Sequence, residues 1–148
     1  MSAPEIASRL LAAIKSKTYE FIVVNFANAD MVGHTGNLKA AIQAIETVDG
    51  LFKEIIEAVV EQDGVALMTA DHGNAEMMFD PQTGEINKEH TANAVPIIIV
   101  GKDFMREKSA PPDLSSLIPS GVLADIAPTI LSIAGLPIPQ EMTGHSLI

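Results

Sequence analysis

Apolar residues recur along the chain at the spacing of one helix face. Residues 4–16 carry one such stripe, and residues 37–62 carry a longer one. A stripe of this kind is typical of a helix that packs one side against a core and turns the other to water. A third helix is expected over residues 121–134, interrupted early by Pro128 and ended by Gly135.

Other apolar residues form short continuous runs, which are typical of buried strands. They occupy residues 19–26, 65–70 and 95–100, and residues 76–79 are a shorter candidate strand. Residues 102–120 carry several prolines and are expected to be irregular.

Strands that alternate with helices predict an α/β fold, with three αβα layers around a mostly parallel sheet. So few strands would leave apolar faces and sheet edges uncovered. We therefore expect the fold to be incomplete in this chain, and its exposed sheet edges to favour self-association.

Composition narrows the possible partners. The 9 Lys and Arg residues against 19 Asp and Glu residues give a net charge of −10. An acidic surface repels nucleic acid and anionic membranes, so neither is an expected partner. There is no cysteine, which excludes disulfides and thiolate metal sites. No apolar run approaches the ~18 residues of a membrane helix and no signal segment opens the chain, so a cytoplasmic location is expected.

Carboxylate and imidazole groups gather beside the predicted strands. Asp71 and His72 directly follow one strand, Asp30 and His34 follow another, and His90 precedes the third. Ligands of open α/β sheets bind at the carboxyl ends of strands. Oxygen and nitrogen donors without thiolate suit Mn²⁺, Zn²⁺ or iron better than a calcium site. Spacing by four residues allows Asp30 and His34 to lie on one helical turn, although a tight loop is equally compatible.

The simpler interpretation is that some of these residues are ordinary turn or surface residues. It applies to any one of them taken alone, and we retain it for His145, which lies in no such context. Glu76 and Glu89 flank the candidate ligands and are expected to support them or face solvent. Three of the four histidines nevertheless fall beside strand ends with aspartates nearby, which favours a metal site.

Three motifs resemble the cofactor-independent phosphoglycerate mutases of the alkaline phosphatase superfamily. They occupy residues 25–36, 70–76 and 90–96, and a further match at residues 44–49 lies within the long helix. The Asp-His-Gly run alone would mark only the superfamily, whereas the first motif is specific to the mutases. The resemblance covers nearly the whole chain and implies an alkaline-phosphatase-like fold.

The resemblance also implies a ligand set and an activity. Asp30, His34 and His90 would bind one Mn²⁺, and Asp71 and His72 would bind a second, with Zn²⁺ or Mg²⁺ left open. The small-molecule substrate would be phosphoglycerate, whose phosphoryl group passes to a serine and back to the other hydroxyl. Paired cations stabilise the attacking and leaving oxygens of such a transfer and lower the pKa of the serine hydroxyl.

The chain also departs from the family pattern. Its serines, among them Ser8, Ser115 and Ser132, lie in no context like the nucleophile motif, and its only arginines are Arg9 and Arg106. We therefore expect residues 1–148 to be the C-terminal portion of the phosphatase domain, without the nucleophile segment and the inserted substrate-binding domain, and inactive alone. The alternatives are another phosphotransferase or phosphatase of the superfamily, and a non-catalytic metal-binding or interaction domain.

Overall fold

The computed structural model describes residues 2–104 and 118–148, which belong to two compact units, Met1–Asp103 and Phe104–Ile148. Each unit is described by itself. No helix in the described part of the chain is long and apolar enough to cross a bilayer. Most of the segment predicted to be irregular, residues 102–120, lies outside the described residues; its first residues form the short 3₁₀ helix η2, Lys102–Phe104.

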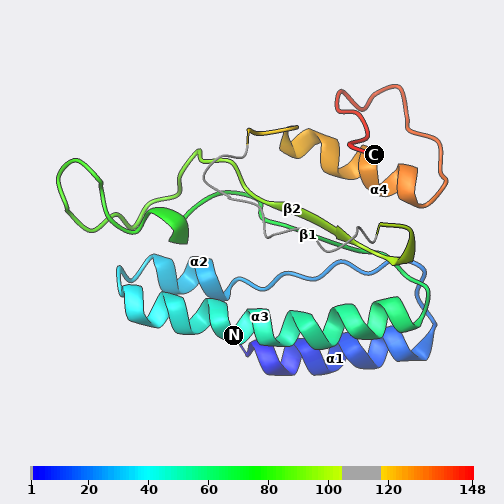
Figure 1. Ribbon diagram of the computed structural model, residues 1–148, viewed down its shortest axis with the longest axis horizontal. Coiled ribbons are helices and arrows are strands. Elements are labelled where there is room, and N and C mark those ends of the chain that lie inside the picture. Colours follow the sequence, from blue (N-terminus) through cyan, green and yellow to red (C-terminus); the bar gives the residue numbers. More distant parts are fainter. Residues whose placement is uncertain (1, 105–117) are drawn as a thin grey trace. The chain divides into compact units, whose positions relative to one another are not determined.

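Two long helices, α1 (Ala3–Ser16) and α3 (Leu38–Glu61), pack along each other in the first unit (Figure 1). Each begins at a polar residue whose side chain accepts a hydrogen bond from the first turn, Ser2 in α1 and Asn37 in α3. Their buried contact is made by the cluster Ala7, Leu10 and Ile55. The apolar stripes read from the sequence therefore form the core of this unit, and both helix predictions are confirmed.

Two strands, β1 (Ala66–Thr69) and β2 (Ile97–Val100), form the sheet of the described residues. They pair antiparallel, with Ala66 opposite Val100. The predicted parallel order is therefore wrong for this pair. A parallel pair needs a crossover, usually a helix, whereas the connection here holds only η1 (Ala75–Met77) and a turn closed by a bridge between Phe79 and Ile86. The candidate strand at residues 76–79 is likewise replaced by η1 and that bridge.

Residues 19–26, predicted as the first strand, form an extended segment between α1 and α2 (Asn28–Gly33) but no strand (Figure 1). Among the described residues the backbone of this segment makes no hydrogen bond. Its exposed fractions alternate, with Phe21 and Val23 at 61% and 79% and Ile22 and Val24 at 36% and 42%. That alternation is typical of strand conformation, so what the segment lacks is a hydrogen-bonded neighbour.

The second unit contains η4 (Leu123–Asp125) and α4 (Ile126–Ile133). The helix starts later than predicted, and Pro128 lies within its first turn, where proline is tolerated, instead of interrupting it. Asp125 is buried, and its carboxylate accepts hydrogen bonds from the N–H groups of Val122 and His145 at 2.8 and 2.9 Å. These bonds attach the C-terminal tail to the start of α4.

Candidate metal centre

Asp30 and His34 come from one short helical turn. Asp30 lies within α2 and His34 caps its C-terminus, so a spacing of four residues places both side chains on one side of the helix. Asp30 Oδ1 lies 3.2 Å from His34 Nε2. Of the two geometries that the sequence left open, the structure has the helical one.

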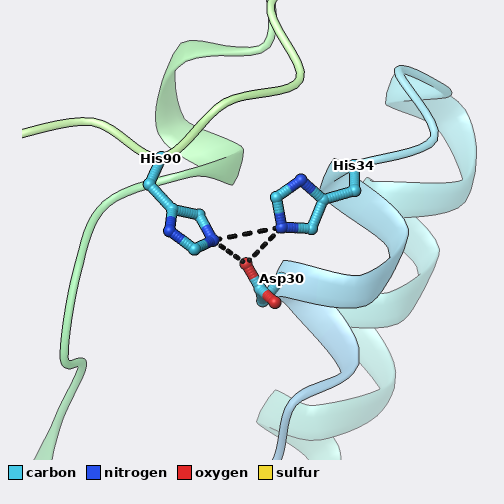
Figure 2. A group of neighbouring side chains, drawn as sticks. All are labelled: Asp30, His34 and His90. Carbon is cyan, nitrogen blue, oxygen red and sulfur yellow. Dashed lines mark hydrogen bonds and ion pairs between the residues drawn. The ribbon is translucent and has the colours of Figure 1, made fainter.

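His90 reaches the same point from the loop that precedes β2. Its Nε2 atom lies 3.2 Å from Asp30 Oδ1 and 3.1 Å from His34 Nε2. Figure 2 shows the three side chains converging from α2 and from the His90 loop. Asp30, His34 and His90 thus present one oxygen and two nitrogens toward a common centre, which we call the ligand triad.

A backbone carbonyl fixes which nitrogen of His34 faces the triad. His34 Nδ1 lies 2.5 Å from the carbonyl oxygen of Lys88. Because a carbonyl can only accept, Nδ1 carries the hydrogen and donates it, which leaves a lone pair on Nε2 of the neutral ring. A hydrogen bond to the far nitrogen is the usual arrangement of a metal-binding histidine.

The spacing of the donor atoms fits a single small divalent ion. Ligands about 2.1 Å from one ion, at angles of about 90° to 109°, lie roughly 3.0 to 3.4 Å apart. The separations in the ligand triad, 3.1 to 3.2 Å, fall within that range. Two imidazoles and a carboxylate also suit Mn²⁺, Zn²⁺ or Co²⁺ in their donor chemistry.

The other two predicted ligands lie beside the ligand triad but do not join it. The side chain of Asp71 is 87% exposed, and its Oδ1 atom lies 3.6 Å from His72 Nε2. The ring of His72 stacks on that of His90 with centroids 3.7 Å apart. Within residues 2–104 and 118–148, the ligand triad is the one group of three donors that the structure brings together.

Sequence reasoning missed the role of Lys88. Lys88 is exposed, and it contacts the site through its backbone carbonyl oxygen. No side-chain pattern signals such a contact, because every residue type carries the same carbonyl. His145, which we left outside the site, lies in the second unit with its side chain 81% exposed.

Comparison with known families agrees with these motifs. Residues 1–138 match the family model described as the Metalloenzyme superfamily. The chain belongs to this superfamily. It is also similar over its full length to two proteins named 2,3-bisphosphoglycerate-independent phosphoglycerate mutase, from Thiobacillus denitrificans at 51% identity and Clostridioides difficile at 49%. The chain spans 27% and 28% of those relatives, so it corresponds to about a quarter of their length.

A solved structure gives the same picture of this superfamily member. Leishmania mexicana phosphoglycerate mutase, determined at low cobalt concentration, superposes with a TM-score of 0.78 at 31% sequence identity. The match covers 97% of this chain and 27% of that protein. The α/β class is therefore shared with a phosphoglycerate mutase, in a form consistent with an incomplete alkaline-phosphatase-like fold.

Proposed function

We propose that this chain supplies the metal-binding part of a 2,3-bisphosphoglycerate-independent phosphoglycerate mutase, which interconverts 2- and 3-phosphoglycerate through a phosphoserine intermediate. The observation that carries the proposal is the ligand triad, with donor atoms 3.1 to 3.2 Å apart on two segments of the chain. Similarity to named mutases over the whole of this chain supports the proposal. The activity is proposed for the longer protein, with a serine outside these residues as nucleophile, and not for the 148 residues alone.

The proposed fold is the three-layer arrangement of the alkaline phosphatase superfamily. In it, β1 and β2 form part of a wider sheet, and α1 and α3 cover one face. The superposition on a phosphoglycerate mutase supports this arrangement. The extended segment at residues 19–26 would be a further strand of that sheet, since its backbone donors and acceptors have no strand partner among the described residues.

The proposed ions are two divalent cations, Mn²⁺ by preference, with Zn²⁺ or Mg²⁺ as alternatives. Asp30, His34 and His90 would hold one, and Asp71 and His72 would contribute to the other. The related crystal structures were determined at low cobalt concentration, and Co²⁺ is an ion that accepts mixed nitrogen and oxygen donors. Such ions stabilise charge on a transferring phosphoryl group and on the oxygens it moves between.

Calorimetric titration with Mn²⁺ tests the metal site directly. The wild-type chain should bind at the ligand triad, and His34→Ala should lose that binding by at least about tenfold in affinity, because one of three donors disappears. His145→Ala is the matched control, since its exposed imidazole lies in the other unit. Equal Mn²⁺ affinity in the wild type and His34→Ala would contradict the proposal, and so would loss of binding in the control. Mutase assays on the same samples should show no turnover by the chain alone.

A further inference from the structure

The carboxylate of Glu76 joins two loops that carry candidate ligands. Glu76 lies four residues beyond His72, and its Oε2 atom accepts a hydrogen bond from the backbone N–H of Asn74 at 2.6 Å. Its Oε1 atom accepts the hydroxyl of Thr91, which follows His90, and the side-chain N–H of Asn93 at 3.0 Å. One side chain therefore holds the loop after β1 against the His90 loop.

Backbone contact reinforces the same junction. The N–H of Thr91 donates to the carbonyl of Gly73 at 2.8 Å. A β-carbon at Gly73 would collide with Thr91 Oγ1 and Glu76 Oε1, so glycine is needed for this close approach. The two loops are packed together at the point where Glu76 bonds to both.

The junction extends to α2 through Asn74. Asn74 is buried, and its side-chain oxygen occupies the space that a β-carbon would need at Gly33. Gly33 directly precedes His34 in the chain. By fixing the backbone of Asn74, Glu76 thus also bears on the end of α2 that presents the ligand triad.

The chemistry of this network requires a carboxylate. All three partners of Glu76 are donors, so both of its oxygens must accept. Partial burial alone would raise the pKa of Glu76, but the hydrogen bonds from Thr91, Asn93 and backbone N–H groups outweigh it and hold the pKa below its ordinary value. Glutamine has one acceptor oxygen, so it either leaves the Asn74 N–H without an acceptor or requires Thr91 and Asn93 to present oxygens in place of hydrogens.

We propose that Glu76 is a positioning residue that holds three segments in register: the loop after β1, the His90 loop and the end of α2. This inference rests on the proposed metal function, since its consequence is that His90 faces Asp30 and His34. It assigns Glu76 no contact with the ion or the substrate.

Glu76→Gln in the full chain tests the inference, with Glu85→Gln as control. Both substitutions remove one negative charge. Glu85 is exposed, and its side chain makes no hydrogen bond among the described residues, so only the change at Glu76 disturbs the network. Glu76→Gln should weaken Mn²⁺ binding by about tenfold. Residues that hydrogen-bond directly to a metal ligand typically change affinity by about 10- to 100-fold, and Glu76 acts on His90 one step further away, through Thr91. Amide hydrogen exchange should become faster at Asn74 and Thr91 and stay unchanged in α3. The control should match the wild type in both measurements.

Unchanged Mn²⁺ affinity together with unchanged exchange at Thr91 would overturn the inference. Faster exchange throughout α3 would overturn it too, because the residue would then serve general stability. If the wild type binds no Mn²⁺, the proposed metal site fails, and exchange at Asn74 and Thr91 still decides the positioning role. Should Glu76→Gln not fold, Asn93→Ala removes one donor and leaves the carboxylate, and a smaller loss in the same direction is expected.

Discussion

Two helical glycines differ in the space around them, and replacing each by alanine should change the stability of the chain in opposite directions. Gly50 lies in α3 with nothing within 4 Å of an added β-carbon. Gly50→Ala should therefore stabilise the chain by about 0.5 to 1 kcal/mol through helix propensity alone. At Gly33 in α2 the added carbon would overlap Asn74 Oδ1 and lie 2.9 Å from Asn74 Cγ.

Asn74 cannot easily yield to that carbon, because the residue is only 7% exposed. Overpacking of a filled site costs about 1 to 3 kcal/mol. Since the gain in propensity is common to both variants, Gly33→Ala should be less stable than Gly50→Ala by about that amount. Urea unfolding followed by circular dichroism measures the difference, and Mn²⁺ titration should show weaker binding for Gly33→Ala alone. Equal stability of the two variants would refute the packing argument.

Two further predictions concern acid stability and self-association. The N–H groups of Val122 and His145 hold the pKa of Asp125 below its ordinary value, so its contribution to stability is present above about pH 3.9 and lost as the pH falls toward the lowered value. Melting curves between pH 5 and pH 2 should therefore depend less on pH in Asp125→Asn, and an unchanged pH dependence would contradict this. Val23→Lys should reduce self-association, measured by sedimentation velocity, because Val23 is 79% exposed in the unpaired segment at residues 19–26. Ile118→Lys is the control, at a side chain 88% exposed outside that segment, and should have a smaller effect. Equal effects of the two changes would contradict self-association through residues 19–26.

The two long helices of the first unit were predictable because their signals are local, whereas the short helix α2 was not predicted. The apolar stripes over residues 4–16 and 37–62 match α1 and α3 within a residue at each end. Their caps, Ser2 and Asn37, lie next to the residues they serve. Periodicity and capping depend on neighbours within a few positions, so the sequence alone contains the information.

Strand pairing was not predictable, because a strand is defined by its partner. The apolar run at residues 95–100 contains β2, yet nothing local specifies its antiparallel pairing with β1. The run at residues 19–26 has the same composition and forms no strand, since no neighbour pairs with it among the described residues. Apolar composition reports burial in the completed fold, whereas hydrogen bonding depends on which segments are present.

The candidate site divides in the same way. Residue type and spacing pointed to five donors, and the family resemblance grouped three of them, Asp30, His34 and His90, which the structure brings together. Asp71 and His72 lie beside the ligand triad without joining it, and their metal role remains a prediction. Contacts that orient the ligands, such as the Lys88 carbonyl on His34, depend on the path of the backbone and leave no trace in residue types.

The separation of His34 from His90 along the chain has a consequence for folding. The two rings are 56 positions apart, and α3 and β1 lie between them. An ion bound to both would act as a cross-link that closes this loop, and the chain-entropy model assigns such closure about 4 kcal/mol in the unfolded ensemble. The long helix and the strand that lie between the two rings would then unfold together with the site in one cooperative transition, and the ion concentration would set the stability of that unit.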